Sequence, residues 1–123
     1  MTEPIEKRRY PRIPDRLSVR SASPDHGAAE MTTTNLSLGG ACVVSRRFLP
    51  LMTRVEVTLH LPPESEEEAR PRAVKAEAVV VRVEPARPGP EDAAYELALF
   101  FSRLEAPDRL ALGRYLSILS RGR

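Results

Sequence analysis

Apolar and polar residues alternate along much of the chain, which is the pattern of β-strands that bury one face in a core. The clearest example is Val55 to Leu61, where valine and leucine alternate with Glu56, Thr58 and His60. Turn residues rich in proline and glycine separate the strand-like runs, and Ser21 to Glu30 and Pro62 to Pro71 are predicted to be loops. The six predicted strands are Arg16–Arg20, Met31–Asn35, Ala41–Val44, Val55–Leu61, Ala73–Glu84 and Tyr95–Phe101.

Two of these strands depart from simple alternation. Ala41–Val44 is continuously apolar, which predicts a strand that is buried on both faces or crosses the core. Along Ala73–Glu84 the polar residues change from odd-numbered to even-numbered positions. Because strand faces alternate strictly, this change predicts a β-bulge or a sharp coil near Ala78 to Val80, as is common where a sheet curls into a barrel.

The C-terminal stretch has the spacing of an amphipathic helix. Pro107 and Asp108 suit its first turn, and Gly122 suits its end. Its apolar stripe consists of Leu112, Tyr115, Leu116 and Leu119. Six short strands followed by one helix predict a mainly all-β fold, a six-stranded antiparallel β-barrel with one C-terminal α-helix on it or across an open end.

Composition narrows the class of protein. A chain of 123 residues with 41% hydrophobic and 29% charged residues fits one globular domain, and twelve prolines argue against long helices. Residues 1–15 are predicted to be a flexible arm, and 16–123 the barrel with its helix. The single cysteine cannot form an internal disulfide, and there is neither a signal peptide nor an apolar run that could span a membrane. A cytoplasmic protein is expected.

The N-terminal arm concentrates positive charge. Lys7, Arg8, Arg9 and Arg12 lie within six positions, and neighbouring prolines keep the segment extended. An arginine fork fits phosphate oxygens or the O6 and N7 atoms of guanine, so Arg8 and Arg12 are candidates to hold a guanine nucleotide. The alternatives are a solvated basic tail and an arm that follows a nucleic-acid backbone. No aromatic stacking platform or recognition helix accompanies the arm, which disfavours nucleic acid.

A second distinctive stretch runs from Asn35 to Gly40 and joins two predicted strands. Asn35 and Ser37 alternate, so both side chains can face a base or a phosphate from the same side. Gly39 and Gly40 permit a tight corner, and Gly40 leaves room for something to press against the chain. The alternative is a polar turn whose side chains satisfy their own backbone.

Other reactive residues give no sign of catalysis. His26 falls in a predicted loop and His60 on a polar strand face, so neither has the spacing of a metal ligand. Cys42 is predicted to be a core residue, and Ser37 lacks the partners of a nucleophile. We therefore expect no enzyme activity, no catalytic residues and no bound metal.

Read together, Arg8-x-x-x-Arg12 and Asn35-x-Ser37-x-x-Gly40 resemble the paired RxxxR and [DN]xSxxG signature of PilZ domains, bacterial receptors for cyclic di-GMP. The order of the motifs, followed by a barrel and a helix, extends the resemblance over nearly the whole chain. It implies that cyclic di-GMP is the ligand, bound by Arg8, Arg12, Asn35, Ser37 and Gly40. Lys7, Arg9 and Gly39 would be accessory, and there would be no other cofactor.

The resemblance also implies a mode of action. The arm would close on the ligand, and unidentified effector proteins in motility, type IV pilus or surface-polysaccharide regulation would read that change. Two alternatives stay open, a PilZ-like interaction module that works without nucleotide and a barrel that binds nucleic acid. The sequence leaves open whether the protein forms a homodimer.

Overall fold

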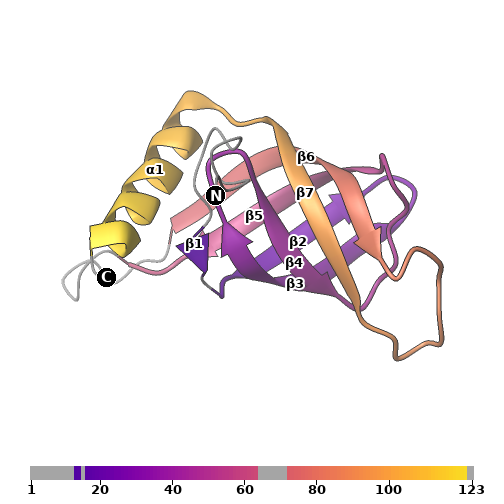
Figure 1. Ribbon diagram of the computed structural model, residues 1–123. Helices are drawn as coiled ribbons and strands as arrows, with labels where there is room; N and C mark the ends of the chain where they lie inside the picture. Colours follow the sequence, from indigo (N-terminus) through magenta and orange to yellow (C-terminus); the bar gives the residue numbers. More distant parts are fainter. Residues whose placement is uncertain (1–12, 15, 64–71, 122–123) are drawn as a thin grey trace, which may run out of the picture.

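The computed structural model describes residues 13–14, 16–63 and 72–121, which form a barrel of β-strands with one helix (Figure 1). In chain order the elements are β1 (Ile13–Pro14), β2 (Ser18–Ser23), β3 (Gly27–Leu36), β4 (Gly40–Ser45), β5 (Arg54–Leu61), β6 (Arg72–Glu84), β7 (Tyr95–Arg103) and α1 (Ala106–Arg121).

The strands close into a ring. Their order is β1-β3-β2-β5-β6-β7-β4, every pairing is antiparallel, and β4 pairs back onto β3. Six strands therefore form a closed barrel, and the two-residue β1 lies beside the end of β3. The predicted six-stranded antiparallel barrel with a C-terminal helix is confirmed.

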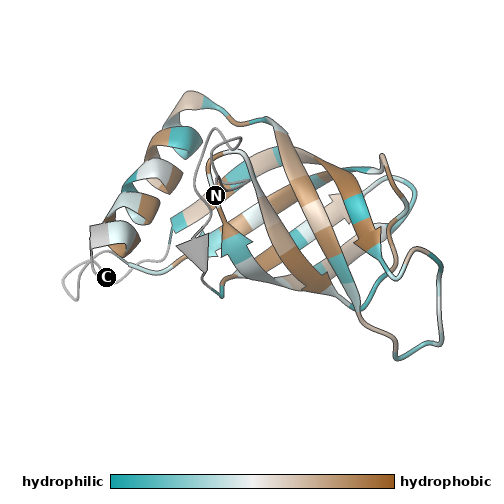
Figure 2. Cartoon of the chain, viewed as in Figure 1, coloured by the Kyte–Doolittle hydropathy of each residue, from teal (hydrophilic) through white to brown (hydrophobic). Residues whose placement is uncertain are grey.

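Alternation along the strands places the core inside this barrel. Along β5, valine and leucine at every second position are buried, and Arg54, Glu56 and His60 between them are exposed. Along β7 the alternation is less regular, because Ala98 is also buried and Phe100 on the outer face is 54% exposed. The same sequence of apolar and polar residues is visible in the colouring of Figure 2. Burial of these side chains is the main force that holds the ring closed.

The predicted loop from Ser21 to Glu30 is wrong. β2 continues to Ser23 and β3 begins at Gly27, so the connection is only a short turn. Gly27 has a φ of +70°, a left-handed conformation that glycine adopts at little cost, and this permits the tight turn. Small residues on both sides of the turn continue the ladder, with Ala22 paired to Ala28.

β4 confirms the strand predicted at Ala41–Val44 but not its burial on both faces. Ala41 and Val43 point inward and are 1% exposed, whereas Val44 on the outer face is 36% exposed. Cys42, predicted to lie in the core, is only half-buried on that same outer face. The physical reason is that, among the described elements, β4 packs chiefly beside its sheet neighbours β3 and β7, while α1 lies against β6 and β1.

The predicted irregularity in β6 is confirmed. Its pairing with β7 shifts register twice, between Glu77 and Ala78 and between Val80 and Arg82. The first shift skips Ser102 of β7 and leaves the alternation of β6 unchanged. The second skips Val81 of β6, so burial passes from Val80 to Val83 and the polar residues change parity there.

The helix α1 covers one end of the barrel and lies against β6 and β1 (Figure 1). Leu112 and Leu116 of the predicted stripe are buried, and Tyr115 and Leu119 are half-buried. Asp108 is in the first turn, where a carboxylate interacts favourably with the helix dipole. Across the described ranges, no helix combines the length and the hydrophobicity that crossing a membrane requires.

Candidate functional site

The second motif forms the corner between β3 and β4. Asn35 is the second-last residue of β3, and Gly40 is the first residue of β4. The Ser37 amide donates a hydrogen bond to the Gly40 carbonyl oxygen at 2.9 Å, which closes the connection between the two strands. The sequence prediction of a tight corner at this place is confirmed.

The Ser37 hydroxyl holds this corner together. Its oxygen accepts hydrogen bonds from the amides of Gly39 and Gly40 at 3.1 and 3.2 Å. The hydroxyl also lies 3.3 Å from the Gly40 carbonyl oxygen, to which it donates. Ser37 is only 3% exposed. In this structure Ser37 is thus the polar turn residue that satisfies its own backbone, and contact with a ligand stays a prediction.

Gly40 is required by the neighbouring strand. A Cβ atom at this position would lie 2.1 Å from the Leu99 carbonyl oxygen, far inside van der Waals contact. The adjacent Gly39 carbonyl accepts a hydrogen bond from the Phe101 amide at 2.9 Å. The group that presses against Gly40 is therefore the backbone of β7, which locks the corner to the barrel.

Asn35 connects the corner to the start of the described chain. It is half-buried and is the register partner of Cys42 on β4 and of Pro14 on β1. Arg8 and Arg12 of the first motif and the accessory candidates Lys7 and Arg9 lie outside the described residues, whereas the accessory candidate Gly39 lies in the corner. Ile13, however, follows Arg12 directly in the sequence and pairs with Leu36. The chain thus continues from the first motif into a strand beside the second.

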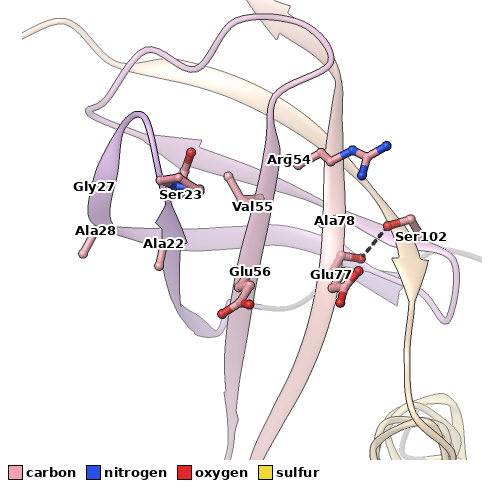
Figure 3. A pocket seen from close by; sticks show the side chains of 11 residues that line it. Ala22, Ser23, Gly27, Ala28, Arg54, Val55, Glu56, Glu77, Ala78 and Ser102 are labelled. Atoms are coloured by element: carbon pink, nitrogen blue, oxygen red, sulfur yellow. Dashed lines mark hydrogen bonds between the residues drawn. The ribbon is translucent and has the colours of Figure 1, made fainter.

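A separate hollow of about 560 Å³ was not anticipated from the sequence (Figure 3). It contains none of the predicted site residues. Two carboxylates, Glu56 and Glu77, stand at its edge, and they are direct register partners on β5 and β6. The other lining residues are Ala22, Ser23, Pro24, Gly27, Ala28, Arg54, Val55, Ala78 and Ser102. Only the strand register brings these residues together, so no local sequence pattern could have identified the hollow.

Beside the hollow, Arg103 forms an ion pair with Glu105. The Arg103 Nε atom donates to the Glu105 Oε2 atom at 2.7 Å, and both side chains are exposed. This hydrogen bond, with the charges of Glu105 and then of Glu77, raises the pKa of Arg103.

Within the described ranges, His, Cys, Asp and Glu side chains form no group of three that could hold a metal ion.

Comparison with known proteins identifies similar domains. The family model for the PilZ domain matches residues 6–117. The PilZ domain of Escherichia coli YcgR, solved with c-di-GMP, is 16% identical, with a TM-score of 0.66 over 94% of this chain and 93% of that chain. YcgR from Escherichia coli in complex with c-di-GMP is 18% identical, with a TM-score of 0.67 over 94% of this chain and 47% of that chain.

The Bacillus subtilis inhibitor of motility, MotI, has the same fold. It is 24% identical, with a TM-score of 0.74 over 94% of this chain and 52% of that chain. The chain therefore spans about half the length of MotI. None of the curated protein sequences matches it. Because all three identities are below 25%, the likeness to these solved structures establishes the fold alone.

Proposed function

Because this chain belongs to the PilZ domain family, we propose that it is a receptor for cyclic di-GMP and not an enzyme. The observation that carries the proposal is the position of β1. Ile13 and Pro14 directly follow the RxxxR motif and pair with Leu36 and Asn35 at the [DN]xSxxG corner. The strand that follows the first motif in sequence therefore pairs with the strand end where the second motif begins.

The ligand chemistry suits these residues. In the proposed complex, Arg8 and Arg12 bind phosphates and guanine edges through their planar forks, and Lys7 and Arg9 add to the positive field. Asn35 contributes an amide that can donate to and accept from a base. Since Ser37 is bonded to the backbone, its main contribution is to fix the corner in the shape that receives the ligand.

We further propose that ligand binding orders the arm against the barrel. Charge-assisted hydrogen bonds to the phosphates would offset the conformational entropy lost by the arm. A protein partner would then recognise the closed form. MotI is an inhibitor of motility, so motility is one process in which we propose such a partner, with pili and surface polysaccharide as others.

The test is calorimetric titration of cyclic di-GMP into the wild type and into Arg8→Ala and Arg12→Ala. We expect a Kd in the micromolar range or tighter, weakened about 10- to 100-fold by either substitution, because a hydrogen bond to a charged group contributes about 1.5–3 kcal/mol. The matched control is Arg16→Ala, which removes an exposed arginine outside the motif and should leave affinity unchanged.

Titration with GTP tests selectivity for the dimeric nucleotide. If the folded wild type binds no cyclic di-GMP, the receptor proposal is wrong. An equal loss of affinity in Arg16→Ala would mean that Arg8 and Arg12 contribute only to the overall positive charge of this part of the chain.

A further inference from the structure

The hollow described above lies over the outer surface of the barrel and has an apolar floor. Ala22 and Ala28 are exposed and are register partners on β2 and β3. Val55 and Ala78 also line the hollow, but both are buried and alternate with the outward-facing Glu56 and Glu77, so their side chains point into the barrel. Outer positions of a barrel usually hold polar residues, so the two alanines leave a recess where larger side chains would stand. The recess is thus a concave apolar surface that is open to solvent.

Two like charges face each other at the edge of this recess. Glu56 and Glu77 are register partners on adjacent strands and are both exposed, so their side chains lie on the same face. Like charges in this relationship destabilise a sheet. Within the described residues neither carboxylate forms an ion pair. Arg103 is bonded to Glu105, and it interacts with Glu77 only through its charge. The side chain of Arg54 also lines the hollow, but its guanidinium points away from both carboxylates in Figure 3.

An arginine side chain from another protein could both fill the apolar recess and offset the repulsion between the two carboxylates. Its aliphatic stem can cover apolar floor, while its planar fork can donate to two carboxylates at once. We propose that the hollow is a docking site for an arginine carried on an exposed segment of a protein partner. The recess receives the stem, and Glu56 and Glu77 together receive the guanidinium.

The hollow is close to the proposed ligand corner along β7. The Phe101 amide is bonded to the Gly39 carbonyl in the corner. The next residue, Ser102, lines the hollow and donates from its hydroxyl to the Glu77 carbonyl oxygen at 3.2 Å. Two consecutive residues of one strand therefore connect Gly39 to the hollow. This connection makes the hollow a suitable surface for passing the ligand signal to a partner, and that role rests on the proposed receptor function. The docking of an arginine does not depend on the receptor function.

A second pair of glutamates provides a matched control. Glu84 and Glu96 are also exposed register partners, on β6 and β7. They carry the same charge in the same relationship but do not line the hollow. A partner attracted only by negative charge would respond equally to both pairs, whereas one that docks in the recess would respond only to Glu56 and Glu77.

The experiment is an NMR titration of ¹⁵N-labelled protein with the peptide acetyl-Leu-Arg-Leu-amide. The control peptide carries citrulline, a neutral analogue of the same shape, in place of arginine. We expect saturable shifts of the Ala22, Glu56 and Glu77 amides with the arginine peptide. The double variant E56Q/E77Q should weaken binding at least tenfold, whereas E84Q/E96Q should stay within twofold of the wild type.

Other outcomes overturn the inference. No saturable shift at these amides, equal binding of the citrulline peptide, or equal weakening by the two double variants would each exclude an arginine site in the hollow. The same protein titrated with cyclic di-GMP separates this inference from the receptor proposal. Failure to bind the nucleotide leaves the docking result unaffected, and nucleotide binding without peptide binding overturns only the docking site.

Discussion

The Leu99 carbonyl oxygen lies where a side chain at Gly40 would have to be, since a Cβ atom there would come within 2.1 Å of it. Both partners of this contact are backbone, and neither can move without disturbing the pairing of β4 with β7. The glycine of the second motif is therefore a requirement of the barrel before any ligand is present.

Gly40→Ala should accordingly destabilise the fold by about 1–3 kcal/mol or more, the usual cost of overpacking a core. Urea denaturation measures the change. Gly113→Ala is the control, because nothing lies within 4 Å of its Cβ position and alanine favours a helix by about 0.5–1 kcal/mol over glycine. Equal stability of Gly40→Ala and the wild type would contradict the close contact.

Ser37→Ala should loosen the corner. It removes the acceptor used by the Gly39 and Gly40 amides, and leaving buried donors unpaired costs about 1–3 kcal/mol. Hydrogen exchange of those two amides should become faster, and thermal unfolding should occur at a lower temperature. The exposed Ser117→Ala serves as control, and unchanged exchange at Gly39 and Gly40 would show that the hydroxyl does not hold the turn.

Glu56→Gln should stabilise the protein by about 0.2–1 kcal/mol, because it removes the repulsion from Glu77. Salt screens exposed charges, so the gain should shrink as the NaCl concentration rises. Glu30→Gln should behave oppositely, since Glu30 is paired in register with Arg20 and loses an attraction. Urea denaturation at low and high salt measures both changes, and effects of the same sign would argue against the observed register.

Leu112→Ala should test the docking of α1 on the barrel. Leu112 is fully buried, and truncation of such a leucine costs about 2–5 kcal/mol. Leu110 is 68% exposed on the same helix, so Leu110→Ala should change stability by less than about 0.5 kcal/mol. Thermal denaturation of both variants gives the comparison, and similar effects would mean that the helix face is assigned wrongly.

The sequence predicted those features of the fold that depend on local alternation. The regular pattern of Val55–Leu61 predicted a strand, and the change of parity in Ala73–Glu84 predicted its bulges. The prediction is wrong at Ser21–Glu30, because Pro24 and Gly27 indicate a loop in the sequence but mark only a short turn in the structure. Turn residues show where a chain reverses, not how far the flanking strands extend.

For the candidate site, the sequence predicted the corner but not the environment of its residues. Whether the Ser37 hydroxyl faces a ligand or its own backbone depends on the exact conformation of the turn, which a motif does not specify. Exposure of Val44 depends on what covers the outer face of β4. The proximity of Glu56 and Glu77 depends on the register of two strands, which is decided by the whole barrel.

The pairing of β4 with β7 also sets when the corner can exist during biosynthesis. Gly40 pairs with Phe100, although 60 positions separate them, and β7 is the last strand to leave the ribosome. Barrels built on such distant contacts fold slowly, because bringing distant segments together costs conformational entropy before their contacts can stabilise the fold. A nascent chain that ends within β6 already contains both motifs but lacks the strand that locks Gly39 and Gly40. The corner can therefore reach its observed shape only late in synthesis, after the chain has been extended through β7.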